Sequence, residues 1–68
     1  MRFTIGTHVK TLKEVFTFGY NEGARDNCKW GVKGTIVEVH DSHGLCYIVL
    51  HTDGSRAPYE PEELKEIK

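Results

Sequence analysis

Hydrophobic and polar positions alternate most clearly between Gly34 and His51, where two apolar segments flank a short polar one. The segments 35–40 and 45–50 are rich in β-branched and aromatic residues, and residues 41–44 are of types that favour turns. This pattern predicts a β-hairpin at the centre of the fold.

The pairing of the two arms decides which face of the hairpin is buried. If Val39 lies opposite Cys46, one face is almost wholly apolar, with Thr35, Val37, Val39, Cys46, Ile48 and Leu50. We expect this face to form the floor of the core, with Cys46 as a small buried side chain. The opposite, mixed face should be partly exposed; it carries Ile36, Glu38, His40, Leu45, Tyr47, Val49 and His51.

The residues before the hairpin predict a strand and a long loop. Residues 7–15 alternate imperfectly and favour a strand with Val9, and either Ile5 or Leu12, facing inward. A short helix over 11–16, capped by Thr11, is the alternative. Residues 16–30 lose the alternation but contain four aromatic residues, so we expect a loop that packs against the domain.

The residues after the hairpin predict three short elements. Asp53-Gly54 is a strong hairpin signal, so residues 56–59 should return as a strand, and Pro58 suggests that this strand is short or lies at an edge. Residues 61–64 begin with proline and acidic residues, as one turn of 3₁₀ helix does. Residues 65–68 then form a last strand, with Leu64 and Ile67 inward.

Several short motifs match a known family pattern. They are Ile5-Gly6 with Val9, Gly31-x-Lys33-Gly34-x-Ile36, Tyr47-x-Val49, Asp53-Gly54, Tyr59 and Glu63-Leu64. The chain thus resembles SH3-like, KOW-like and Tudor-like small barrels, and its layout is similar to that of small YorP-type proteins of Bacillus prophages. The resemblance implies an all-β, SH3-like barrel of about five strands over residues 1–68, and a phage or prophage origin. It implies no activity, because its matching residues are mainly turn glycines and core positions.

Composition limits the possible partners and locations. The 68 residues suffice for one domain, and the net charge of −1 gives no overall attraction to nucleic acid or anionic lipid. No segment is apolar enough to span a membrane, and the N-terminus does not resemble a signal peptide. We expect a monomer in the cytoplasm, of the host if phage-encoded, with Cys28 and Cys46 as free thiols.

The histidines and cysteines suggest two kinds of chemistry, metal binding and catalysis. His40, His43 and Cys46 are spaced by three residues, but in the expected pairing His40 and Cys46 point to opposite faces, so we expect no metal. A chain this short also has little room for a catalytic pocket, so we expect no enzyme and no cofactor. The four histidines are interpreted as solvated residues of turns and strand ends.

The aromatic residues suggest binding of a partner protein. SH3-like barrels commonly bind peptides or partner proteins through a groove between long loops, and aromatic residues are favoured anchors at interfaces. The candidate binding residues are Tyr20, Arg25, Trp30, Tyr47, Arg56 and Tyr59. We expect Tyr20 and Tyr59 to be exposed because their hydroxyls need a partner or water. The alternative for Trp30 and Phe16 is that they fill the ends of the barrel. The alternative is a KOW-like module that binds nucleic acid through Arg25, Lys29, Lys33 and Arg56 beside the aromatics.

Overall fold

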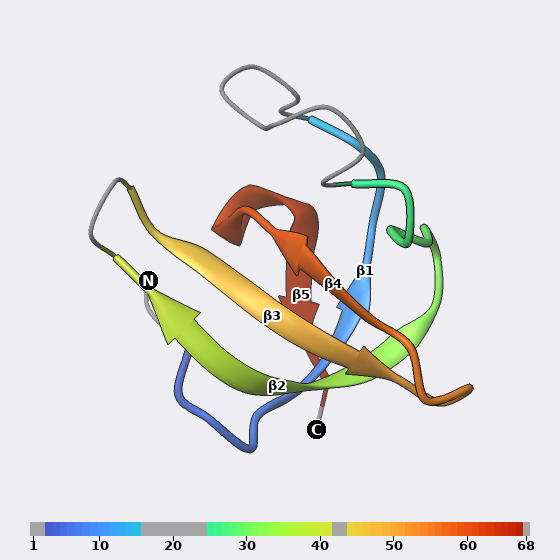
Figure 1. Cartoon of the computed structure of the whole chain (residues 1–68), viewed down its shortest axis with the longest axis horizontal. Helices are drawn as coiled ribbons and strands as arrows, with labels where there is room; N and C mark the ends of the chain where they lie inside the picture. The colour runs from blue at the N-terminus through green and yellow to red at the C-terminus, as the bar shows by residue number, and fades with distance from the viewer. Residues whose placement is uncertain (1–2, 16–24, 42–43, 68) are drawn as a thin grey trace.

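Five antiparallel strands form one sheet in the computed structural model, which describes residues 3–15, 25–41 and 44–67 (Figure 1). The elements are β1 (His8–Thr11), β2 (Lys33–His40), β3 (Cys46–His51), β4 (Arg56–Tyr59), the 3₁₀ turn η1 (Pro61–Glu63) and β5 (Leu64–Glu66). The predicted all-β fold is confirmed. The strand order is β4-β3-β2-β1-β5, and no pairing among the described residues joins the edge strands β4 and β5. Closure into a barrel therefore stays a prediction.

The central hairpin contains a β-bulge that the sequence pattern did not reveal. Thr35 lies opposite Leu50 as predicted, but the register shifts between Ile36 and Glu38. Beyond the shift, His40 lies opposite Cys46, so the predicted Val39–Cys46 pair is wrong. A bulge adds one residue to one strand only, and this changes which side chains face inward.

The bulge reverses the predicted core face. Before it, Gly34 and Ile36 face inward; after it, Val39 packs against the core while Glu38 and His40 are exposed. On β3 the inward residues are Tyr47, Val49 and His51. The face that looked mixed in the sequence is therefore the buried one, because its two polar members on β2 turn outward at the bulge. The predicted floor is wrong: Val37, Cys46, Ile48 and Leu50 are half-buried on the opposite side.

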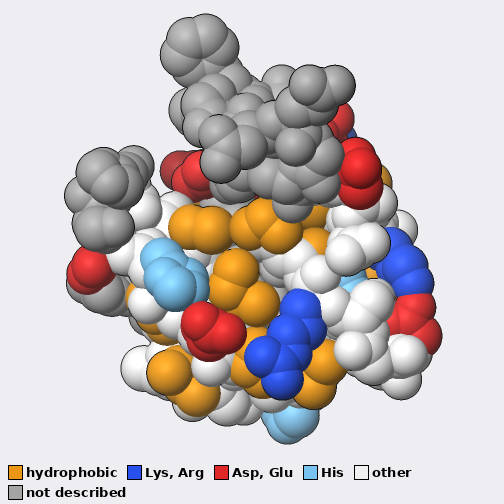
Figure 2. Space-filling view, viewed as in Figure 1, with side chains coloured by type: hydrophobic (Ala, Val, Ile, Leu, Met, Phe, Trp, Pro, Cys, Tyr) orange, Lys and Arg blue, Asp and Glu red, His pale blue; other side chains and the backbone are white. Residues whose placement is uncertain are grey.

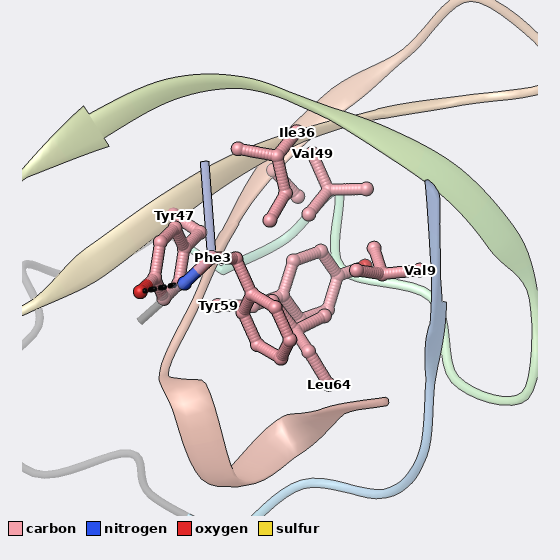
Figure 3. Close-up of a cluster of buried hydrophobic side chains, with 8 residues drawn as sticks. Phe3, Val9, Ile36, Tyr47, Val49, Tyr59 and Leu64 are labelled. Atoms are coloured by element: carbon pink, nitrogen blue, oxygen red, sulfur yellow. Dashed lines mark hydrogen bonds between the residues drawn. The ribbon is translucent and has the colours of Figure 1, made fainter. Parts of the chain in front are cut away.

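The core combines aliphatic side chains with three aromatic rings (Figure 3). Its buried hydrophobic members are Phe3, Val9, Ile36, Tyr47, Val49, Ala57, Tyr59 and Leu64. The rings of Phe3 and Tyr47 meet edge to face at 5.3 Å, and the backbone N–H of Phe3 donates to the Tyr47 hydroxyl at 2.8 Å. Large rings thus fill a core that a chain of this length could not fill with aliphatic residues alone.

Strand β1 is shorter than the sequence pattern suggests. Val9 and Thr11 face inward with no exposed surface, whereas Ile5 and Leu12 are 66% and 42% exposed. The predicted inward position of Val9 is confirmed, and those of Ile5 and Leu12 are wrong. No helix begins at Thr11; its hydroxyl instead bonds the backbone of Val32 (3.1 and 3.3 Å), which satisfies it inside the core.

The C-terminal third follows its sequence signals closely. The turn before β4 closes with a bond from His51 N–H to the Ser55 carbonyl, and Gly54 adopts φ 94°, which favours glycine. The 3₁₀ turn and β4 occur where predicted. Leu64 is buried as expected, but Ile67 is only half-buried.

Pro58 lies on an edge strand, as predicted. Hydrogen-bonded and non-bonded pairs alternate along an antiparallel ladder. Because His51 and Ser55 form a bonded pair, the pair Ile48–Pro58 falls at a non-bonded position. The missing N–H of proline therefore faces outward and costs the sheet no bond.

Candidate interaction surface

Two of the predicted binding residues, Tyr47 and Tyr59, lie in the core with no exposed surface (Figure 3). The expectation that Tyr59 is exposed is wrong, because its hydroxyl finds partners inside the protein. It donates to the Lys29 carbonyl (2.9 Å) and accepts from the Lys29 N–H (2.7 Å). Burial raises the pKa of Tyr59 to about 12. Tyr59 thus ties the loop before β2 to strand β4.

His51 completes the network around Tyr59. Its Nε2 lies 2.7 Å from the Tyr59 hydroxyl, and its Nδ1 lies 2.9 Å from Ser55 Oγ. Tyr59 donates its hydroxyl proton to the Lys29 carbonyl, and Ser55 donates its hydroxyl proton to Asp53 Oδ1, so a neutral His51 can donate to only one of these two hydroxyl oxygens. Burial lowers the pKa of His51 below its usual 6.5. The prediction that all histidines are solvated is therefore wrong for His51, which is 4% exposed.

Arg25 forms a buried ion pair instead of lying on the surface. Its Nη2 is 2.5 Å from Glu63 Oε1, and the two side chains are 9% and 0% exposed. Glu63 also accepts backbone N–H bonds from Val15 and Glu60, both at 2.9 Å. The carboxylate thereby joins the loop, η1 and the segment after β1. Arg25 is a structural cation in this conformation.

The other predicted residues occupy separate places. Trp30 is half-buried, with its ring 5.2 Å from that of Tyr59 and Arg25 5.4 Å from its centroid. Arg56 is exposed, 3.8 Å from Glu38. Tyr20 and Phe16 lie outside the described residues. The structure therefore does not bring the described candidates together as one exposed aromatic cluster.

A different surface gathers apolar side chains on three adjacent strands. Alternation along β2, β3 and β4 sends one set of residues away from the core. We call this set the outer face: Thr35, Val37, Glu38, His40, Cys46, Ile48, Leu50, Arg56 and Pro58. Its apolar members are half-buried, and its exposed members are charged residues or histidine. Figure 2 shows hydrophobic side chains over these strands, with acidic and basic side chains among them.

A groove of about 370 Å³ lies where this face continues toward β1. Its walls include His8, Lys33, Thr35, Leu50, Thr52 and Ile67. The Nδ1 of His8 lies 3.1 Å from Thr35 Oγ1, so these two side chains form a hydrogen bond between adjacent strands. The groove places an apolar floor beside groups that can form hydrogen bonds.

A break in the alternation of apolar and polar residues on β2 indicates the outer face in the sequence itself. Two apolar residues, Ile36 and Val37, are adjacent on β2, whereas apolar and polar residues alternate from Val37 to His40. This break in the alternation marks the bulge. A uniform pairing would place the Ile48 and Leu50 side chains in the core, whereas the bulge places them on the outer face. A change of phase within one strand is a general sign of a bulge.

Among the described residues, the cysteines and histidines do not form a cluster of metal ligands. Both cysteines are free, and the Cys28 thiol donates to the Pro58 carbonyl at 3.2 Å. Burial raises the pKa of Cys28, which favours the unreactive thiol. His40 and Cys46 share a face, contrary to prediction, but no three histidine, cysteine or acidic side chains cluster as a metal site within the described segments.

Comparison with known proteins adds no family to this description. The chain matches no family model, no curated protein and no solved structure. Within residues 3–15, 25–41 and 44–67, no helix is long and apolar enough to cross a membrane. The geometry of the outer face and of the groove is therefore the basis for proposing a function.

Proposed function

We propose that this protein is a small interaction module without catalytic activity, which binds a partner protein through the outer face. The proposal rests on one observation: the adjacent strands β3 and β4 direct Ile48, Leu50 and Pro58 away from a core that other residues fill. Apolar side chains grouped on a surface mark sites of protein recognition.

The pairing of the strands explains how this surface is organised. Glu38, Ile48 and Pro58 form one row across β2, β3 and β4. Thr35, Leu50 and Arg56 form the next row. The contact between Arg56 and Glu38 crosses both rows and leaves charges of both signs beside the apolar centre. An apolar centre with a polar edge is the usual anatomy of a protein interface.

This proposal changes the predicted anchors but not the predicted class of function. Arg56 belongs to the outer face, whereas Tyr47 and Tyr59 are buried in the core on the opposite side of the sheet. The proposed absence of catalysis is supported by the hydrogen-bonded Cys28 thiol, whose raised pKa disfavours a nucleophile. Two free thiols support a reducing compartment such as the cytoplasm.

Three of the four cations predicted for the nucleic-acid alternative lie beside carboxylates, and the fourth, Lys33, is exposed. Arg25 is buried against Glu63, Lys29 forms an ion pair with Asp53, and Arg56 lies near Glu38. Phosphate contact needs exposed cations free of such competition. These residues do not form that kind of surface.

A pair of matched substitutions tests the proposal. Ile48→Lys places a cation at the centre of the outer face, directly opposite Glu38, where an opposite-charge pair supports the strand. Ile5→Lys makes the same change at a site that is 66% exposed, outside the outer face. Each tagged protein is used to capture proteins from lysate of its source cells, and each captured protein is purified and titrated against all three forms.

The expected result is a partner that binds the wild type and Ile5→Lys with equal affinity and Ile48→Lys at least tenfold more weakly. Circular dichroism and urea unfolding establish that Ile48→Lys is folded. Equal affinity for all three forms would contradict the proposal, as would the absence of any partner that distinguishes Ile48→Lys from Ile5→Lys.

A further inference from the structure

Three lysines face each other directly across β2, β1 and β5. Lys10 is the pairing partner of Lys33 on one side and of Lys65 on the other. All three are exposed. We call Lys33, Lys10 and Lys65 the lysine row. Like charges placed directly opposite one another in a sheet are unfavourable for folding, so the row is not explained by stability.

The hydrogen-bond pattern fixes how close these lysines are. The Ile36 N–H donates to the Thr7 carbonyl and the Thr11 N–H donates to the Val32 carbonyl. Lys10 and Lys33 therefore form a non-bonded pair, with Cα atoms about 4.5 Å apart. Lys10 and Lys65 form a bonded pair, at about 5.5 Å. The row therefore places three cationic side chains side by side on the sheet.

No carboxylate of the described residues forms an ion pair with the lysine row. The ion pairs of those residues involve Arg25, Lys29, His40 and Arg56, and none involves a member of the lysine row. The chain as a whole has a net charge of −1, so the row is a local feature rather than the result of a basic composition. An external anionic group is the natural counterpart.

The row borders the groove described above. Thr35 and His8 pair in the neighbouring row of the same side of the sheet, and Ile67 follows through its backbone bond to His8. Leu50 and Ile67 supply apolar floor, and Lys33 belongs to both the groove and the lysine row. A ligand seated in the groove would thus meet an apolar surface and positive charge together.

We propose that the groove and the lysine row bind an acidic, extended segment of a partner protein, with an apolar side chain in the groove and carboxylates facing the lysines. This inference rests on the proposed function and specifies the chemistry of the partner. A phosphate backbone would use the lysines but leave the apolar floor unfilled, and among the described residues no Phe, Tyr or Trp lines the groove to stack a base. A peptide uses both features.

Labelled peptides test the inference directly. The probe is an oligo-glutamate peptide with one central leucine, and its controls replace the leucine by serine or the glutamates by lysines. Binding is followed by fluorescence anisotropy at low salt, and the contact surface by backbone amide shifts. Single-stranded oligothymidylate serves as the nucleic-acid probe.

We expect the glutamate–leucine peptide to shift amides of the lysine row and groove. Lys10→Glu should weaken its binding about tenfold, since a central attraction becomes a repulsion. Lys13→Glu, the same change in an exposed lysine beyond the end of β1, should leave it nearly unchanged. Molar salt should weaken binding, because it reduces the screening length to about 3 Å.

Four results would overturn the inference: no binding at low salt, an equal loss with Lys13→Glu, equal binding of the serine peptide, or tighter binding of oligothymidylate. The proposed function fails separately. If a captured partner distinguishes Ile48→Lys but binds Lys10→Glu as well as the wild type, the outer face is a docking site and the lysine row is not part of it.

Discussion

Polar groups on the inner side of the sheet have hydrogen-bond partners, whereas the lysines on the outer side face one another. Inside, the hydroxyls of Tyr47 and Tyr59 and the carboxylate of Glu63 all have hydrogen-bond partners. Outside, Lys10, Lys33 and Lys65 stand together although they repel one another. The inner side is organised for stability, because unsatisfied buried polar groups are costly. The outer side departs from that rule, and such departures mark surfaces used for binding.

Substituting Glu63 should produce the largest loss on the inner side. Glu63→Gln removes the charge that faces Arg25 in a site with almost no solvent, so the free energy of unfolding should fall by about 3–5 kcal/mol. Urea unfolding measures this change. The neighbouring exposed residue provides the control, and Glu62→Gln should change stability by less than about 0.5 kcal/mol. Similar effects of the two changes would contradict the role assigned to the ion pair.

Removing the Tyr59 hydroxyl should have the next largest effect. Tyr59→Phe keeps the ring but leaves His51 Nε2 and the backbone of Lys29 without this partner, so stability should fall by about 1–3 kcal/mol. Tyr47→Phe is the matched change, and it loses only the bond from Phe3. Urea unfolding should show a smaller loss for Tyr47→Phe, and the reverse order would argue against the network around Tyr59.

Acid should weaken the inner side through His51. Its pKa is lowered on folding, so the ring is neutral in both states above pH 6.5 and its contribution is fully present there. As the pH falls below 6.5, the unfolded chain binds a proton first, and stability declines until the pH reaches the lower pKa of the folded state. Urea unfolding across this range should show a steeper decline for the wild type than for His51→Gln. Parallel declines would show that other groups are responsible.

The outer side should show the smallest effect, and of opposite sign. Lys10→Gln removes the central charge of the lysine row, so the free energy of unfolding should rise by about 0.5 kcal/mol at low salt. The gain should shrink in high salt, where the repulsion is already screened. Thermal unfolding at both salt concentrations measures it. A loss of stability with Lys10→Gln would mean that the row contributes to folding, contrary to the contrast drawn above.

Local signals in the sequence were sufficient for most of the fold. Asp53-Gly54, Pro58 and Pro61 each restrict their own backbone, and the turn, the edge strand and the 3₁₀ turn occur where these residues predict them. The alternation around Val9 likewise identified one inward residue of β1 correctly. These features depend on residues close together in the chain.

The features that were missed depend on distant contacts or on one extra residue. The bulge at Val37 reverses the assignment of Ile48 and Leu50, because a break in alternation on β2 does not by itself give the pairing with β3. Tyr59 was expected at the surface because its hydroxyl partner, Lys29, is 30 residues away in sequence. The pairing of Arg25 with Glu63 spans 38 residues and follows no periodicity.

Pro58 also affects how copies of this protein meet in concentrated solution. An open sheet edge can template the addition of strands from other molecules, and ordered aggregates grow in that way. At Pro58 an incoming strand would find no N–H donor, and the carbonyl already accepts the Cys28 thiol. This position therefore interrupts the template at the β4 edge, and alkylation of Cys28 would remove the donor that occupies the Pro58 carbonyl.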